Sequence, residues 1–213
     1  MGIGQFDFSF FFNYSIHASI YNKGLPIKSS NNFAIPIQTH STNIKFVKRI
    51  GKYDNVDGLI CSKKYRIPLS IQVADCVPIY IFDQKTKYYG LFHSGWRGTK
   101  NKIISKALNI FINDIKSTPN NILIVIGPHI QKCCYKVDWD VAQFFSYVNK
   151  DDKKNKWFLN LNQEIKNDIL KFNIPIKNIY CSNICTYESL DCESFRRDGV
   201  KANRMLGVMK YVW

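Results

Sequence analysis

The sequence lacks any long apolar run. No uncharged apolar stretch among its 213 residues approaches the roughly 18 residues that a membrane-spanning helix needs. The N-terminal stretch MGIGQFDFSFFFN has no basic residue before its apolar run, although a secretory signal requires one. Phe6 stands where a myristoylation signal has Ser or Thr. We therefore expect a cytoplasmic protein without a membrane partner.

Acidic residues are scarce as well, with 16 of them against 30 basic residues and a formal net charge of +14. Such a charge is typical of nucleic-acid-binding proteins. The lysines, however, are scattered among isoleucines and asparagines, and no RNP, zinc-knuckle or helix-turn-helix pattern accompanies them. We expect no nucleic-acid partner, but a basic surface favours small anionic ligands such as phosphate.

Paired C-x-x-C motifs are missing from the seven cysteines. The odd number, without a secretory signal, predicts reduced thiols rather than a disulfide framework. Cys181, Cys185 and Cys192 could form a metal cluster, but their spacing favours buried free thiols. The vicinal pair Cys133 and Cys134 could be reactive, although two half-buried thiols are the simpler expectation.

Short apolar runs bounded by turn residues predict strands, most of them buried, at residues 69–73, 79–82, 88–92, 122–126, 178–184 and 205–212. Helical patterning covers residues 100–115 behind Thr99 as N-cap, and residues 138 to about 148 behind Asp138. A third helix is marked by Leu161, Ile165, Ile169 and Leu170, and the polar stretch 149–156 is predicted as a loop. Neither an internal repeat nor a low-complexity linker divides the chain, so we expect one compact layered domain of helices and strands.

The stretch FHSGWRGT, residues 92–99, places a glycine-bracketed turn between a predicted strand and a predicted helix. Gly95 and Gly98 permit backbone angles or close approaches that other residues resist. The amide groups at the start of the helix, with Arg97 beside them, suit phosphate or another anion. Arg97 could instead pair with a carboxylate while Trp96 simply packs, and the local sequence does not separate these alternatives.

Histidine is rare in this chain, which has only His17, His40, His93 and His129. His40 and His93 lie at the ends of apolar stretches, and Cys76 follows another one in VADCVPIY. Two imidazoles and a thiolate are the ligands of a catalytic zinc site with an open fourth position, although single structural histidines are the alternative. His129 is predicted to be an exposed loop residue.

Arginines near the C-terminus, in SFRRDG and NRM, offer further positive charge. Arg196, Arg197 and Arg204 could complete an anion pocket or lie on a solvated face. Asp75, next to Cys76, is a candidate for proton transfer or for positioning the thiolate.

Taken together, the motifs IQTH, DGLI, ADCVPI, HSGWRGT, IGPHIQKCCYKV, CTY and SFRRDG resemble one family. This is the bacterial laccase-domain family, also called the multicopper polyphenol oxidoreductase, purine nucleoside phosphorylase or peptidoglycan editing factor family. The resemblance runs from about Gln38 to the C-terminus. It implies a single α+β domain over residues 1–213, with mixed β-sheets in a layered sandwich, and a metal held by His40, Cys76 and His93.

The resemblance also implies phosphorolysis of adenosine, inosine and methylthioadenosine, with adenosine deamination as a side activity. Purine nucleoside and phosphate are then the small-molecule partners, and homo-oligomer formation is left open. The chain departs from the family at Lys136, where the family has Glu. Its region before Gln38 is short and lacks the family's Arg-x-Gly-Gly-Val-Ser and Ser-Leu-Asn segments, which puts the substrate choice in question.

Four histidines cannot supply the imidazoles of a complete multicopper oxidase, so we expect Zn²⁺, with a single Cu²⁺ as the alternative. Cys76, Asp75 and Arg97 are the predicted catalytic residues. Gln38, Arg97, Arg196 and Arg204 are predicted to bind nucleoside and phosphate. The competing hypotheses are a metal-dependent hydrolase acting on a cell-wall precursor, a copper polyphenol oxidoreductase, and a non-enzymatic binder.

Overall fold

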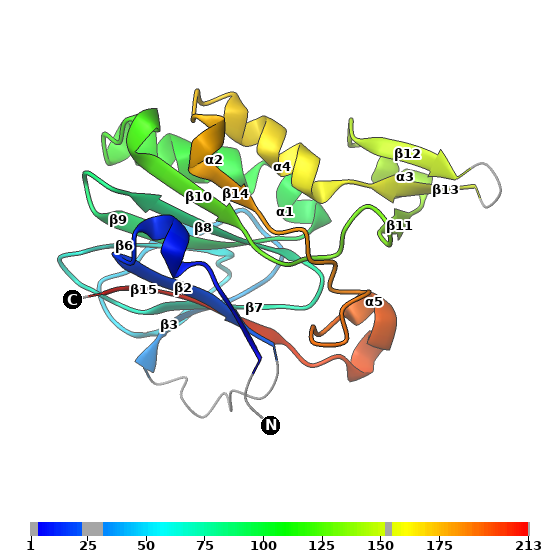
Figure 1. The fold of residues 1–213 in the computed structure, drawn as a ribbon, viewed down its shortest axis with the longest axis horizontal. Coiled ribbons are helices and arrows are strands. Elements are labelled where there is room, and N and C mark those ends of the chain that lie inside the picture. The colour runs from blue at the N-terminus through cyan, green and yellow to red at the C-terminus, as the bar shows by residue number, and fades with distance from the viewer. Residues whose placement is uncertain (1–3, 23–31, 152–154, 213) are drawn as a thin grey trace.

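Two six-stranded mixed sheets lie face to face in the computed structural model, which describes residues 4–22, 32–151 and 155–212 (Figure 1). The first sheet has the order β1 (Gln5–Asp7), β2 (Ile16–Tyr21), β15 (Met205–Tyr211), β7 (Leu69–Val73), β3 (Ala34–Ile37) and β5 (Gly51–Asp54). The second has the order β14 (Ile179–Cys181), β10 (Ile122–Ile126), β8 (Val77–Asp83), β9 (Tyr88–Ser94), β6 (Gly58–Ser62) and β4 (Ile44–Phe46).

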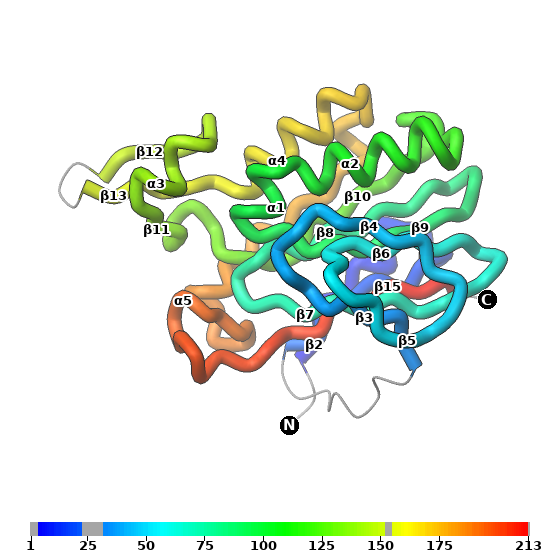
Figure 2. Tube along the Cα trace, turned by 180° about the vertical axis from the view of Figure 1, so that it is seen from behind, coloured from blue at the N-terminus to red at the C-terminus, as the bar shows by residue number. Residues whose placement is uncertain are grey.

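A helical layer covers the outer face of the second sheet (Figure 1). It consists of α1 (Trp96–Lys100), α2 (Ile103–Asn109) and α4 (Leu161–Leu170). A small third sheet, β11 (Lys136–Val137), β13 (Lys156–Leu159) and β12 (Val148–Asp151), projects from one end beside α3 (Trp139–Ala142) (Figure 2). The short α5 (Phe195–Asp198) precedes β15. None of the helices in the described ranges is long and apolar enough to cross a membrane.

The side chains of strand β8 pack into two hydrophobic cores, one on each face of the second sheet. Tyr80 and Phe82 are buried between the sheets, whereas Ile79 and Ile81 are buried against the helical layer. Successive side chains of a strand point to opposite faces, so a strand covered on both faces is apolar throughout. Each of these side chains contributes about 1.5–3 kcal/mol by its burial. The second sheet is therefore the central layer of a sheet–sheet–helix sandwich.

Most predicted strands are confirmed. Residues 69–73 and 122–126 match β7 and β10, and the runs at 79–82, 88–92 and 205–212 lie in or largely overlap β8, β9 and β15. The run at 178–184 forms only the short strand β14. The predicted α+β class with mixed sheets in a layered sandwich is confirmed.

The helix predicted at 100–115 starts earlier and is interrupted. It begins at Trp96, with Gly95 as N-cap, and breaks at Lys102, which adopts a left-handed φ of 62°. Thr99 is therefore inside α1 rather than the N-cap, and its hydroxyl donates a hydrogen bond of 3.0 Å to the Gly95 carbonyl. Beyond α2 the chain continues as a π-helical turn over Ile110–Asp114.

The helix predicted behind Asp138 is also wrong beyond its first turn, since α3 ends at Ala142. The cause is a distant carboxylate: Glu164 of α4 accepts a hydrogen bond of 2.6 Å from the Ser146 amide, which draws the chain out of the helix. The polar stretch at 149–156, predicted as a loop, instead lies in the antiparallel pair β12–β13 where it is described.

Candidate metal centre

The structure brings His40, Cys76 and His93 together at one end of the two main sheets. Their ligand atoms all lie within 4.8 Å of one another. The Cys76 Sγ lies 4.0 Å from the His40 Nε2, and the two imidazole ring centres are 4.9 Å apart. These donors line one side of a pocket of about 820 Å³. The arrangement leaves the side of the three ligands that faces the pocket open.

Each ligand comes from a different part of the sandwich. His40 follows β3 of the first sheet, His93 belongs to β9 of the second, and Cys76 lies on the bend that joins β7 to β8. His40 and Asp75, the residue before Cys76, adopt left-handed backbone angles, with φ of 58° and 79° respectively. Such angles are uncommon outside glycine and mark positions that the surrounding structure fixes.

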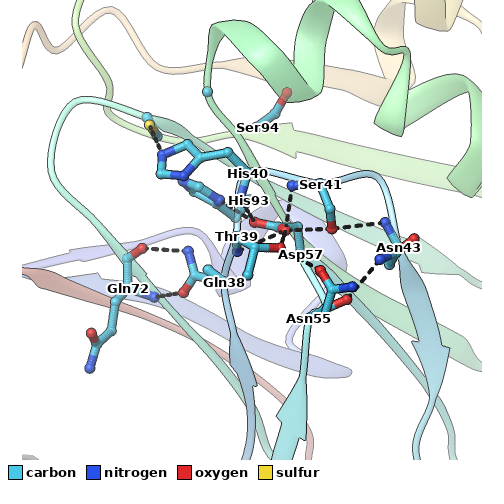
Figure 3. Close-up of polar contacts among 12 residues, drawn as sticks. Gln38, Thr39, His40, Ser41, Asn43, Asn55, Asp57, Gln72, His93 and Ser94 are labelled. Carbon is cyan, nitrogen blue, oxygen red and sulfur yellow. Dashed lines mark hydrogen bonds and ion pairs between the residues drawn. The ribbon is translucent and has the colours of Figure 1, made fainter.

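Asp57 fixes both histidines, and its role was not predicted from the sequence (Figure 3). It is fully buried and lies 2.8 Å from the His93 Nδ1. It also accepts hydrogen bonds from the backbone amides of Thr39 at 3.1 Å, His40 at 3.1 Å and Ser41 at 2.7 Å. Asp57 holds the Nδ1 proton of His93, so a metal that displaces the proton on Nε2 meets a free Nε2 lone pair. The DGLI motif contains this residue, but its pattern gave no chemical signal.

Charge interactions at the site favour an anionic Cys76 and Asp57. Burial acts to raise the pKa of Asp57, but hydrogen bonds from His93, Ser41 and Thr39 outweigh it and lower the pKa to about 2. Burial also acts to raise the pKa of Cys76, and His40 and His93 lower it to about 7. In His93, burial is outweighed by Asp57 and Cys76, which raise its pKa to about 9. Two anions around two imidazoles favour a bound cation.

Gly95 leaves the space that the site requires. A Cβ atom at this position would lie 2.8 Å from the Cys76 Sγ and 3.2 Å from the His40 Cδ2. Its backbone angles, φ −79° and ψ −174°, are extended and open to any residue. Glycine is therefore needed here for close approach rather than for an unusual backbone. The open space and the His₂Cys donor set both fit a metal ion.

The lining of the same pocket also carries positive charge. Arg97, Arg196 and Arg204 line it, together with Trp96 and Tyr135. The Arg97 guanidinium lies 4.4 Å from the Trp96 ring centre and makes no ion pair with a carboxylate in the part of the chain that the structure describes. The alternative in which Arg97 pairs with a carboxylate is thus not observed.

The helix end predicted to assist anion binding is weaker than expected. The segment behind Gly95 is α1, with five residues, rather than a helix that continues to residue 115. Because the macrodipole grows from aligned peptide units, so short a helix supplies little of it. Positive charge in the pocket lining therefore comes from side chains, the three arginines and Lys52.

Asp75 connects the pocket to the loop that carries Thr186 and to helix α5. Its two carboxylate oxygens accept hydrogen bonds of 2.6 Å, one from the Thr186 hydroxyl and one from the Arg196 amide. The Arg196 guanidinium donates to the Lys136 carbonyl and lies 5.2 Å from the Tyr135 ring centre. Asp75 therefore holds Arg196 beside the site.

Three other predicted residues lie elsewhere or are already bonded. Gln38 lines the pocket, but its amide nitrogen and oxygen both bond to the backbone of Gln72, each at 2.8 Å. Arg197 donates to the carbonyls of Thr186, Tyr187, Ser189 and Cys192. His129, predicted as exposed, is fully buried and lies 2.8 Å from the Gly127 carbonyl. That prediction is wrong because the bridge between His129 and Cys185 draws the loop inside.

Comparison with known proteins identifies the family. Residues 18–211 match the model of the multi-copper polyphenol oxidoreductase laccase family. The chain belongs to this family. A purine nucleoside phosphorylase of Borreliella burgdorferi is 32% identical over 198 residues, which cover 84% of this chain and 86% of that protein. A purine nucleoside phosphorylase of Clostridium acetobutylicum is 33% identical over 178 residues, covering 79% and 72%.

Two solved structures share the fold of this chain. YlmD from Geobacillus stearothermophilus superimposes with a TM-score of 0.85 at 23% identity and covers 93% of both chains. The Bacillus licheniformis hypothetical protein YfiH gives a TM-score of 0.81 at 24% identity, covering 93% of this chain and 94% of its own. The family and the His₂Cys cluster together point to a metal, whose identity they leave open.

Proposed function

We propose that this protein is a zinc-dependent purine nucleoside phosphorylase that acts on adenosine, inosine and methylthioadenosine, with adenosine deamination as a side activity. The relatives named purine nucleoside phosphorylase support the reaction class. The observation that carries the proposal is the pocket itself, whose lining contains both the His₂Cys cluster and three arginines. We further propose that residues 1–213 form one domain, because the second sheet contributes to both hydrophobic cores. Its cytoplasmic location remains a prediction.

His40, Cys76 and His93 are the proposed metal ligands, and Zn²⁺ suits them better than a copper cluster. The chain has four histidines, of which His17 is bonded within β2 and His129 is buried elsewhere. When bound, zinc with three protein ligands supplies a Lewis acid at its open position and lowers the pKa of water to about 7. Cys76, with its lowered pKa, is ready to bind as the thiolate.

The arginines are the proposed phosphate contacts. Arg97, Arg196 and Arg204 line the pocket, where their guanidinium groups can orient phosphate towards the ribose C1′. In phosphorolysis a phosphate oxygen bonds to C1′, the bond from C1′ to the purine nitrogen breaks, and the purine leaves with the electron pair and is protonated. The rings of Trp96 and Tyr135 offer apolar faces against which the purine can stack.

Asp75 is proposed to act through position rather than by proton transfer. Both of its oxygens already accept hydrogen bonds, so it orients the Thr186 loop and helix α5 beside Cys76. Gln38 lines the pocket, but its amide holds β3 to β7 through Gln72. It is therefore proposed to shape the pocket.

The test is a product assay with zinc-loaded protein, adenosine and phosphate. We expect adenine and ribose 1-phosphate, and inosine as the minor deamination product. His93→Ala should abolish turnover, and Arg97→Ala should raise the KM for phosphate more than it lowers kcat. Lys52→Ala is the matched control, because Lys52 lines the same pocket at a position with no proposed role. Zinc-loaded protein that forms neither adenine nor inosine would refute the proposal.

A copper oxidoreductase remains the second candidate, because two imidazoles and one thiolate also form a single-copper site. The family name supports this reading. Copper-loaded protein that oxidises a phenol faster than free copper, while zinc-loaded protein leaves nucleosides intact, would favour it. Of the other hypotheses, the cell-wall hydrolase stays a prediction without a supporting contact in the described residues.

A further inference from the structure

A second cluster of metal-binding side chains lies outside the His₂Cys site. It contains Cys133, Cys134, Cys185 and Glu188, whose ligand atoms all lie within 4.8 Å of one another. The Sγ atoms of Cys133 and Cys134 are 3.3 Å apart, and the Cys134 Sγ lies 3.5 Å from the Glu188 Oε1. All three cysteines are free thiols. The sequence predicts free thiols for the trio Cys181, Cys185 and Cys192, and of these only Cys185 lies in the cluster.

Two loops that are distant in the sequence meet at this cluster, and backbone contacts hold them in place. The first loop follows β10, the second follows β14, and His129 and Cys185 form a parallel bridge between them. The Gln131 amide donates to the Cys185 Sγ at 3.4 Å, and the Thr186 amide donates to the His129 carbonyl at 3.1 Å. The thiols therefore converge because the loops are fixed, not because they are mobile surface groups.

Arg197 strengthens the second loop. Its guanidinium donates to the carbonyls of Thr186, Tyr187 and Ser189 at 3.0–3.1 Å. This explains why Arg197 does not reach the pocket, where the sequence had placed it as one alternative. The loop that presents Cys185 and Glu188 is thus preorganised for binding, which lowers the entropy cost of capturing a ligand.

Charge also favours a cation at this cluster. Three thiolates and the Glu188 carboxylate would repel one another at these distances. A thiophilic cation offsets that repulsion, because thiolate is the form of cysteine that binds metal.

We propose that Cys133, Cys134, Cys185 and Glu188 bind a second Zn²⁺ ion, separate from the ion at His40, Cys76 and His93. Four ligands of sulfur and oxygen around one ion form the closed set of a structural zinc site. Binding releases the thiol protons and leaves three thiolates and one carboxylate on the ion. The ion would join the loop that precedes Tyr135 to the loop that carries Thr186, so it would fix a wall of the substrate pocket from behind.

Metal stoichiometry of the purified protein tests this proposal. We expect two equivalents of zinc per chain in the native protein, and one in Cys76→Ser. Cys133→Ser and Glu188→Gln change exposed side chains and should retain the fold. Each should weaken the second equivalent at least tenfold in a chelator competition while the His₂Cys site stays loaded. Cys181→Ser is the matched control, because Cys181 is a half-buried thiol outside the cluster, and it should keep both equivalents.

Cobalt substitution gives a second readout that does not depend on activity. The intensity of sulfur-to-cobalt charge-transfer absorption follows the number of thiolate ligands, so Cys76→Ser should retain a strong band and Cys133→Ser should lose most of it. A native protein that binds one equivalent, lost entirely in Cys76→Ser, would overturn the proposal. A disulfide among Cys133, Cys134 and Cys185 in protein purified without reductant would overturn it as well.

Discussion

Gly95→Ala should weaken metal binding through a single added methyl group. The new Cβ atom would lie 2.8 Å from the Cys76 Sγ, whereas non-bonded heavy atoms rest at about 3.5–4.0 Å. The sulfur must therefore move by about 1 Å, while metal sites tolerate deviations of about 0.2 Å. We expect the dissociation constant for zinc to rise at least tenfold, or about 1.4 kcal/mol.

Gly98→Ala is the control for this substitution. Its added Cβ would lie 3.4 Å from the nearest atom, the Ser94 Oγ, and Gly98 lies inside α1. Alanine stabilises a helix interior by up to about 1 kcal/mol relative to glycine, so this variant should fold at least as well as the native protein. Its zinc affinity should not change.

The assay is a zinc titration against a competing chromophoric chelator. It is made in a Cys133→Ser background, so that the His₂Cys site is the one titrated. Circular dichroism before the titration establishes that both glycine variants are folded. If Gly95→Ala binds zinc as tightly as Gly98→Ala, the geometry argued for Cys76 is incorrect.

Three further substitutions test other parts of the site and the fold. Asp57→Asn should reduce zinc affinity by about 10–100-fold, because the His93 imidazole bonded to this carboxylate loses its orientation. Asp54→Asn, which changes an exposed side chain, should have no effect. Equal zinc affinities in the two variants would contradict this role of Asp57. Burial lowers the pKa of His129 from its ordinary value of 6.5 to about 4. At a pH between these two values, His129 is protonated in the unfolded chain but not in the folded chain. Between pH 6.5 and 4.5, the free energy of unfolding of the metal-free protein should therefore fall by about 2 kcal/mol more than that of the His129→Gln variant. Urea unfolding at a series of pH values measures both. Parallel pH profiles of the two proteins would show that His129 is not the cause. Thr186→Val should lower the free energy of unfolding in urea by about 1–3 kcal/mol, because it leaves a buried oxygen of Asp75 without a hydrogen-bond donor. A decrease smaller than the error of the measurement would contradict this.

The sequence predicted the elements whose pattern is local. The alternation of apolar and turn residues located β7 to β10, and the helical period located α4. The predicted helix behind Asp138 failed because Glu164, far along the chain, bonds to the Ser146 amide and ends it. Likewise Lys102 interrupts the predicted helix at 100–115 with a left-handed turn that no residue type marked.

The sequence was sufficient to predict the metal-binding side chains of the candidate site, but not the residue that orients them. His40, Cys76 and His93 were found because imidazole and thiolate are the side chains that zinc prefers. Asp57 was missed, since a lone aspartate before an apolar strand carries no local signal. The cluster of Cys133 with Cys185 was missed for a similar reason, because its members meet only through the His129–Cys185 bridge.

The three proposed ligands of the first site do not belong to one sheet. His40 follows the first sheet, His93 lies in the second, and Cys76 lies on the bend between them. An ion at this place would act as a cross-link between the two halves of the sandwich. By mass action, free metal at about one hundred times its dissociation constant adds about 2.7 kcal/mol to the stability of the folded chain. The thermal denaturation midpoint of this protein would then report the concentration of available metal.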